Sequence, residues 1–139
     1  MWPRTMSNTF NIPESHRYLV ERPLLAMLAT TLPDGTPQAT PVWFSYDGTH
    51  FYFNTAKGRL KARAMEKTPY VALTIVDPQN GFRYIQVRGP VVASEDVGRA
   101  NINALCQRYT GSPVYTFGPP DEVRIKYTLT PEHIQVLGR

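Results

Sequence analysis

Residues 24–54 read LLAMLATTLPDGTPQATPVWFSYDGTHFYFN, and this stretch decides the fold. Its first nine residues form a nearly continuous apolar run that ends at Pro33-Asp34-Gly35-Thr36, a strong turn signal. Residues 37–46 mix apolar and polar side chains as a second strand does. Asp47-Gly48, the strongest short hairpin signal in the chain, then leads into a third, aromatic strand, HFYF. The stretch therefore predicts three antiparallel strands joined by tight turns.

The pattern changes after this stretch. Residues 58–67 (GRLKARAMEK) contain mostly good helix formers and no β-branched residue, so they predict a helix. Thr55 is a candidate cap for its start, and Pro69 ends it. Similar signals predict helices at residues 12–22 and at 94–109 (capped by Ser94), strands at 70–76, 82–93, 123–129 and 133–137, and a Gly/Pro-rich loop at 110–121.

The sum is a mainly β fold of six or seven antiparallel strands with two or three inserted helices. Short strands separated by tight turns favour a small barrel over a parallel sheet. The 139 residues, of which 42% are hydrophobic, fit one domain, with residues 1–12 as a flexible N-terminal extension. We find no secretory signal and no apolar run near the ~20 residues that cross a bilayer, so we expect a soluble cytoplasmic protein without a membrane partner.

The net charge of the chain is concentrated in one short segment. Fifteen Lys and Arg residues against eleven Asp and Glu give a net charge of +4. Residues 57–67 hold five of these bases and a single acid, Glu66, so this segment alone accounts for +4. The remainder is balanced at ten bases and ten acids. This pattern indicates a local anionic ligand more than a broad nucleic-acid-binding face.

The candidate site is the sequence NTAKGRLK at residues 54–61, where a strand ends and the basic helix begins. Free N–H groups and the positive end of the helix dipole meet there, which suits an anion. Arg59 offers a planar two-pronged contact, and Lys61 offers a compact charge. At about 100° per residue, Lys57 and Lys61 share one side of a regular helix and Arg59 and Arg63 share nearly the opposite side, so all four cannot bind one phosphate. Residues of the first turn can still converge on one anion from the open end of the helix. The competing interpretation is that this segment is an ordinary solvated helix face.

Other constellations of chemical groups are weaker. His16, His50 and His133 lie far apart without ligand spacing, so we expect no metal site. Cys106, the single cysteine, lies among apolar residues and is expected to be a core thiol. Neither a Ser-His-Asp arrangement nor a G-x-G-x-x-G fingerprint is present. We therefore predict no catalytic side chain, and a site of this kind suits a cofactor that brings its own reactivity.

The order of these elements resembles the pyridoxamine 5′-phosphate oxidase-like, FMN-binding split-barrel superfamily. Within it, the sequence is most similar to the small deazaflavin-dependent class, whose members use coenzyme F-420 and sometimes bind FMN. The matching motifs are LAT-x-x-x-DG-x-PQ-x-x-PVW at residues 28–43 and N-T-A-x-G-R-x-K-A-R at 54–63, followed by VDP, RY and VRG at Asp77, Tyr84 and Gly89.

The resemblance implies a six-stranded antiparallel split β-barrel that forms a homodimer, with two cofactor sites at the subunit interface. In that family the start of the basic helix holds the cofactor phosphate, a role that falls to Arg59 and Lys61, helped by Lys57. The remaining cofactor-binding residues that it implies are Gln38, Pro41, Val42 and Trp43 on one strand, Asn54, Thr55 and Ala56 on the next, and Tyr84 and Arg88 on a third.

The activity that the resemblance implies is hydride transfer from reduced coenzyme F-420 to an electron-poor small organic acceptor. Pro113, Tyr115 and Phe117 would give the acceptor pocket a stiff aromatic rim. One alternative is an FMN-binding oxidoreductase or flavin carrier of the same fold, and another is a relative that only stores or senses the cofactor. A remote alternative is a non-enzymatic nucleic-acid-binding barrel, which the balanced charge outside residues 57–67 disfavours.

Overall fold

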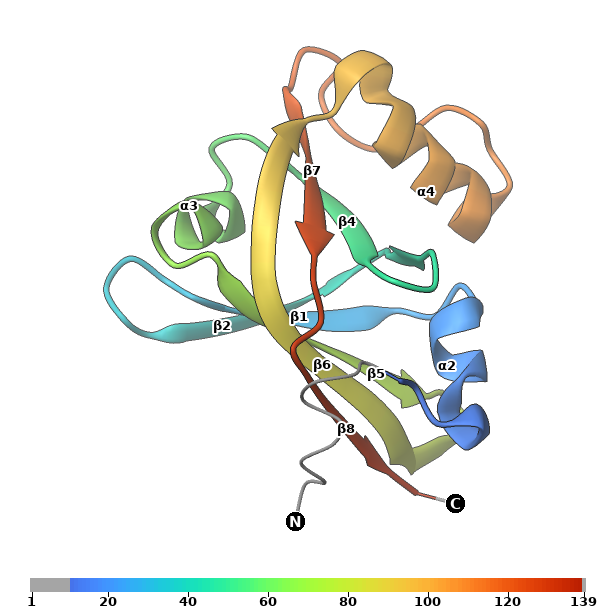
Figure 1. The fold of residues 1–139 in the computed structure, drawn as a ribbon. Helices are drawn as coiled ribbons and strands as arrows, with labels where there is room; N and C mark the ends of the chain where they lie inside the picture. Colours follow the sequence, from blue (N-terminus) through green and yellow to red (C-terminus); the bar gives the residue numbers. More distant parts are fainter. Residues whose placement is uncertain (1–10, 139) are drawn as a thin grey trace.

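The computed structural model describes residues 11–138, and Figure 1 shows their arrangement around one long strand, β6. The strands are β1 (Ala26–Thr31), β2 (Pro37–Val42), β3 (Ser45–Tyr46), β4 (Phe51–Ala56), β5 (Tyr70–Asp77), β6 (Asn80–Glu95), β7 (Arg124–Leu129) and β8 (His133–Leu137). The helices are the 3-10 turns η1 (Glu14–His16) and η2 (Val97–Arg99) and the α-helices α2 (Tyr18–Glu21), α3 (Leu60–Lys67) and α4 (Ala100–Thr110). Within residues 11–138, no helix has the length and apolarity to span a membrane.

The strands form an antiparallel sheet in the order β2-β1-β5-β6-β7-β4-β3, with β8 as a further partner of β6. The first half of β6 pairs with β5 and β8, and its end pairs with β7, so this strand belongs to both halves of the barrel. The two ends of the strand order, β2 and β3, are consecutive in sequence and are joined by Trp43 and Phe44. The split of the barrel therefore lies at these two residues.

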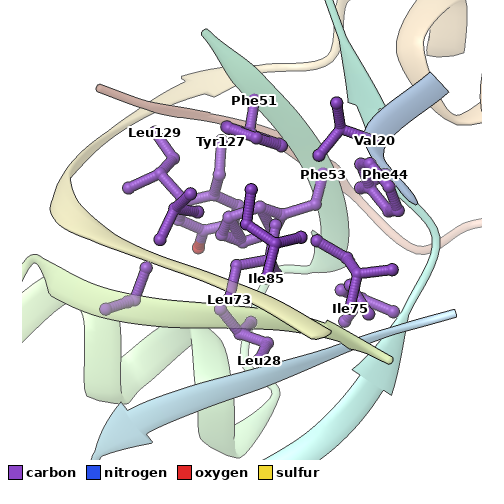
Figure 2. Close-up of a cluster of buried hydrophobic side chains, with 14 of the residues drawn as sticks. Val20, Leu28, Phe44, Phe51, Phe53, Leu73, Ile75, Ile85, Tyr127 and Leu129 are labelled. Carbon is purple, nitrogen blue, oxygen red and sulfur yellow. The ribbon is translucent and has the colours of Figure 1, made fainter. Parts of the chain in front are cut away.

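Alternate side chains of the strands fill the barrel. Figure 2 shows Leu28, Leu73 and Ile85 facing Phe53 and Tyr127 across the interior. All but Tyr127 are fully buried, and Phe53 stacks on Tyr127 with ring centroids 5.3 Å apart. The period of two that fills this core confirms the mainly β, split-barrel prediction.

Helix α4 covers the split, and its side chains pair the peptide groups there. The N–H of Phe44 donates to Tyr109 Oη at 3.1 Å, and Arg108 Nε donates to the Phe44 carbonyl at 3.2 Å. Tyr109 Oη also donates to the Leu24 carbonyl at 2.6 Å, just ahead of β1. Because buried peptide groups need partners, these contacts fix α4 against the open edge of the barrel.

The structure has eight strands where we expected six or seven, because residues 37–46 divide at the split into β2 and β3. The predicted Thr55 cap is wrong: Thr55 lies in β4, and α3 begins after Arg59, which has extended backbone and makes no side-chain cap. The tertiary reason is the pairing of β4 with β7, which keeps Thr55 opposite Ile125.

The predicted helix at residues 94–109 begins later than expected. Ser94 does not cap it, because the pairing of Ser94 with Lys126 extends β6 to Glu95. The carboxylate of Asp96 instead accepts the N–H groups of Asn101 at 2.7 Å and Ile102 at 2.9 Å. Asp96 thus caps the free N–H groups at the start of the helix, although it lies five residues before Asn101, the first residue whose N–H it accepts.

The remaining predictions match more closely. The opening helix is shorter than residues 12–22, a 3-10 turn followed by the four-residue α2, and β8 has the predicted bounds. Cys106 is buried, as expected. Of the predicted flexible extension, residues 1–10 lie outside the described residues, and Ile12 is buried in the core.

Gly89 lies where β6 changes partner from β8 to β7. The chain between those two strands passes directly over it: Thr130 N–H donates to the Pro90 carbonyl at 3.0 Å, and Glu132 N–H donates to the Arg88 carbonyl at 2.8 Å. A Cβ at Gly89 would come within 1.9 Å of the Thr130 carbonyl oxygen. Only glycine allows this approach of two backbone segments.

Replacing Gly89 with alanine is therefore expected to lower the free energy of unfolding by about 3 kcal/mol, because backbone must move to admit the methyl group. Gly81→Ala is the matched control, since the same strand leaves open space there, and we expect its effect to stay within about 0.5 kcal/mol. Urea denaturation of both variants measures the difference. Equal stabilities would show that the crossing does not require glycine.

Candidate functional site

A cavity of about 350 Å³ lies beside the split, between the end of β2, β4, the start of α3, and α4 with the loop that follows it. In Figure 1, β4 runs between α3 on the left and α4 at the upper right. The volume is at the lower end of the range of about 300–1,000 Å³ for small-molecule sites. The lining residues are Leu25, Pro41, Val42, Trp43, Asn54, Thr55, Arg59, Lys61, Ile102, Leu105, Tyr115, Phe117 and Arg124.

One end of the cavity is cationic and adjoins the start of α3. Gly58 has a φ of 88°, which lets the chain turn sharply out of β4 and into the helix. The first helical hydrogen bond runs from Arg63 N–H to the Arg59 carbonyl at 3.0 Å, so the amides between these residues have no partner within the helix. Arg59 and Lys61 thus line the cavity beside N–H groups that can bind an anion.

The charge of Lys61 is affected by its surroundings. Burial lowers the pKa of its ammonium group below the ordinary value of 10.5, and the neighbouring positive charges of Arg59 and Arg124 lower it further. Three cations that repel one another around one cavity favour the entry of negative charge.

The floor of the cavity is held by Asn54, a buried residue of β4. Its amide Nδ2 donates to Asp96 Oδ2 at 3.0 Å and to Asn101 Oδ1 at 2.8 Å. Its carbonyl Oδ1 accepts a hydrogen bond from Arg124 Nε at 2.9 Å. One side chain therefore connects β4 with α4 and with the start of β7.

Another wall of the cavity, next to Arg124, is aromatic. Trp43 stacks on Tyr109 with ring centroids 5.3 Å apart and an interplanar angle of 14°. Tyr115 and Phe117 each meet Trp43 edge-on at 6.1 Å, and Phe117 is 68% exposed. Tyr115 and Phe117 thus lie at the cavity as the aromatic rim that the sequence predicted, and the exposed ring of Phe117 is accessible to a ligand.

The loop that carries this rim is hydrogen-bonded to α4 and to the 3-10 turn η2 before it. Tyr115 N–H donates to Asn103 Oδ1 on α4 at 2.9 Å. Arg99, a non-glycine residue with a φ of 57°, donates from Nη2 to the carbonyls of Pro120 at 3.2 Å and Glu122 at 2.8 Å. These bonds fix the aromatic rings over the cavity mouth.

The cavity brings together seven of the predicted cofactor-binding residues: Pro41, Val42, Trp43, Asn54, Thr55, Arg59 and Lys61. Ala56 is buried at the end of β4. Lys57 is exposed and lines a separate hollow with Arg63 on another side of α3. The prediction that Lys57 joins Arg59 and Lys61 does not match this placement, because the turn at Gly58 separates Lys57 from the helix.

Three other predicted residues do not line this cavity. Gln38 pairs with Thr30 on β1, at the far end of β2 from Val42. Tyr84 and Arg88 alternate with the core residues Ile85 and Val87 on β6, so they face away from the barrel interior. Tyr84 and Arg88 therefore lie on the outer face of the sheet.

Sequence reasoning missed four residues of the cavity: Leu25, Ile102, Leu105 and Arg124. The spacing of Ile102 and Leu105 places them on one face of a helix, a signal equally typical of core residues. Arg124 carries no sequence signal beyond its charge. Among the described residues, no group of three His, Cys, Asp or Glu side chains is arranged to hold a metal ion.

A split β-barrel with a cationic and aromatic cavity at its split defines the class of protein. The model of the family described as Pyridoxamine 5′-phosphate oxidase matches residues 12–137, and the chain belongs to this family. No curated protein matches the chain.

Solved structures of the same fold include one named F420 Reductase. It is 36% identical, with a TM-score of 0.80 over 89% of this chain and 98% of that one. An Agrobacterium tumefaciens protein of unknown function is 23% identical, with a TM-score of 0.72 over 94% of this chain and 59% of that one. A Clostridium acetobutylicum protein related to general stress protein 26 is 21% identical, with a TM-score of 0.64 over 86% and 83%. The family and the structure named F420 Reductase together support an oxidoreductase with a flavin-type cofactor.

The lowered pKa of Lys61 predicts how anion binding depends on pH. The ammonium attracts an anion only while protonated, so affinity for inorganic phosphate should be full below this pKa and fall as pH rises through it. Because the pKa is lowered, the fall should begin at a lower pH than an ordinary lysine gives. In Lys61→Arg it should move to higher pH, since a guanidinium keeps its proton.

Calorimetric titration with phosphate between neutral and strongly alkaline pH measures this dependence. Lys67→Arg, at the exposed end of the same helix, is the control and should leave the curve unchanged. Coincident curves for the wild type and Lys61→Arg would contradict the assignment.

Proposed function

We propose that the protein is a coenzyme F-420-dependent reductase that transfers hydride from the reduced coenzyme to an electron-poor small organic acceptor. One observation carries this proposal: a single cavity combines three cations with a cluster of aromatic rings, in which Tyr115 and Phe117 meet Trp43 edge-on. A phosphorylated, ring-bearing cofactor needs both features. The 36% identity to a structure named F420 Reductase favours the deazaflavin over other flavin-type cofactors.

The residues present fit such a cofactor. Arg59, Lys61 and the first amides of α3 would hold its phosphate, and Asn54 and Thr55 at the end of β4 would lie along the linker and ring. Pro41, Val42 and Trp43, at the end of β2 and in the link to β3, would lie beside its ring, whereas Gln38 is at the other end of β2. When bound, the reduced coenzyme supplies a hydride from its central ring. The side chains of this protein supply binding, orientation and exclusion of water.

The aromatic rim determines which acceptors enter. Phe117 and Trp43 present apolar ring faces, and Leu25 adds an exposed aliphatic side chain at the mouth. A planar, electron-poor acceptor can stack there between the rim and the cofactor ring. Backbone amides near the acceptor oxygen would stabilise negative charge that develops during transfer.

The outer face of the sheet supports assembly as a homodimer. Pro41, Met27, Thr74 and Gln86 pair in register across four strands, so their side chains form one row on this face. Pro41 also lines the cavity, which makes the face continuous with the cavity mouth. We propose that a second copy packs on this face and that its Tyr84 and Arg88 complete the site of its partner.

Replacing Arg59 and Lys61 together with alanine should weaken cofactor binding by about 1–3 kcal/mol for each charge-assisted hydrogen bond removed. Arg63→Ala is the matched control: the residue lies on the same helix but lines a different hollow, and its replacement should leave affinity nearly unchanged. Fluorescence titration of cofactor-stripped protein with F-420 measures all three proteins. Unchanged affinity in the double variant would refute the phosphate assignment.

The same titration run with FMN separates the two cofactor hypotheses. Tight binding of F-420 with weak binding of FMN supports the proposed reductase and justifies a screen of acceptors with the reduced coenzyme. Preference for FMN would make the protein a flavin enzyme or flavin carrier of the same family. Binding of neither would refute the cofactor assignment for this chain.

Ala29→Arg tests the dimer. Ala29 pairs with Ala39 and Ala72 in the middle of the outer face, so an arginine there would block a close-packed partner without entering the core. By light scattering after gel filtration, we expect the wild type to have twice the chain mass of 15.8 kDa. We expect the variant to have the mass of a single chain. The variant should also bind F-420 more weakly.

Val92→Arg is the control, because Val92 is exposed and β6 pairs there with β7, beyond its pairing with β5. It should keep the mass and the affinity of the wild type. A wild type that runs as a monomer, or a variant that still dimerises, would contradict the proposed interface.

A further inference from the structure

Arg124 is the most deeply buried cation of the cavity. It begins β7 and is only 6% exposed. Its Nε donates to Asn54 Oδ1 at 2.9 Å and its Nη1 donates to Glu122 Oε1 at 2.6 Å, while the ring of Tyr115 lies 4.9 Å from Cζ. No described residue accepts a hydrogen bond from Nη2, and the side chain lines the cavity. A nine-tenths-buried guanidinium thus keeps donors for a group inside the cavity.

The position of this guanidinium is fixed from behind. Asn54, which accepts from Arg124, is itself bonded to Asp96 and Asn101. Asp96 in turn accepts two amides at the start of α4. Because these bonds hold Arg124 in one orientation, a ligand would lose little free energy in ordering it.

Glu122 is the acid that sits among these cations. Its side chain is 11% exposed, and its second oxygen, Oε2, lies 3.7 Å from Nη2 of Arg59. A Cβ at Gly118 would come within 2.3 Å of Oε1, so the loop backbone closes over the carboxylate. Glu122 therefore bridges Arg59 and Arg124 and keeps their guanidinium groups close to each other.

The net charge of this cluster suits a phosphate group, which carries a single negative charge as the diester of F-420 and more as a monoester. Arg59, Lys61 and Arg124 provide three positive charges, and Glu122 removes one, which leaves two. A phosphate monoester carries a charge between about −1.5 and −2 near neutral pH. Without the negative charge of Glu122, the three cations would bind such a group more tightly.

We propose that Arg124 is a third phosphate-binding residue of this cavity and that Glu122 is a built-in competitor, whose carboxylate lowers the affinity for the bound anion. The inference rests on the proposed function for the identity of the natural ligand, but the recognition chemistry is that of an anionic phosphate group. Arg59 engages the carboxylate only at 3.7 Å, so an incoming phosphate displaces it there while Arg124 retains its bond to Glu122.

Glu122→Gln tests the competitor role with almost no change of shape. The amide oxygen still accepts from Arg124, but the negative charge is gone, so affinity for inorganic phosphate should rise about tenfold. Arg124→Gln should lower it about tenfold or more, since it removes a charge-assisted hydrogen bond. Glu66→Gln removes the same charge from the exposed face of α3 and should leave the affinity within about twofold.

Isothermal titration of each purified protein with inorganic phosphate provides the readout, with thermal unfolding as the check that each variant is folded. Unchanged or weaker phosphate binding in Glu122→Gln overturns the competitor role. Unchanged binding in a folded Arg124→Gln overturns the binding role of Arg124. If Arg124→Gln does not fold, Arg124→Lys replaces it, and retention of full affinity there would contradict the need for the fixed guanidinium fork.

The experiment separates this inference from the proposed function, because phosphate binding needs no redox cofactor. Phosphate affinity that responds to Glu122 and Arg124 while neither F-420 nor FMN binds would refute the proposed function alone. Tight F-420 binding that depends on Arg59 and Lys61 but ignores Glu122 and Arg124 would refute the inference alone.

Discussion

The peptide groups of Phe44 lie where the barrel runs out of strands, and their pairing is the constraint on which the rest of the structure depends. Between β2 and β3, the Phe44 N–H donates a hydrogen bond to Tyr109 and the Phe44 carbonyl accepts one from Arg108, both on α4. A buried peptide group without such a partner would cost about 1–3 kcal/mol. Helix α4 is therefore required at the split, and the cavity is the space that remains between this helix, β2 and β4. The same contact that completes the barrel creates the site.

A second consequence concerns how charge is kept in this space. The cavity tolerates the buried Arg124 because Asn54 and Glu122 satisfy two of its nitrogens, and because Asn54 is itself anchored to Asp96 on the α4 side. Removing one member of such a network leaves the others buried without partners, so its residues act as a unit. The polar floor of the site and the attachment of α4 are thus one structure, and a change in Asn54 would reach both.

Local sequence signals predicted the parts of the fold that local forces determine. The turns at Pro33-Asp34-Gly35-Thr36 and Asp47-Gly48 and the strands that they join depend on neighbouring residues, and the structure contains them near the predicted positions. The helix starts were wrong because strand pairing with β7 decides where β4 and β6 end, and that pairing joins residues about 30 to 80 positions apart. Arg124 escaped prediction for the same reason, since its value to the site depends on Asn54, a distant residue on another strand.

The basic segment at residues 57–67 shows why the density of charge along a sequence is an incomplete guide to a binding site. Its charges separate once the chain turns at Gly58: Arg59 and Lys61 line the cavity, while Lys57 and Arg63 line a different hollow. The third cation of the cavity comes from β7, and the acid that moderates it comes from the loop before that strand. The Coulomb energy between two charges falls as the distance between them grows, so an anion in the cavity would interact most strongly with this assembled group of four side chains. The local excess of +4 in the sequence indicated the start of α3, but the tertiary structure determines which of its charges line the cavity.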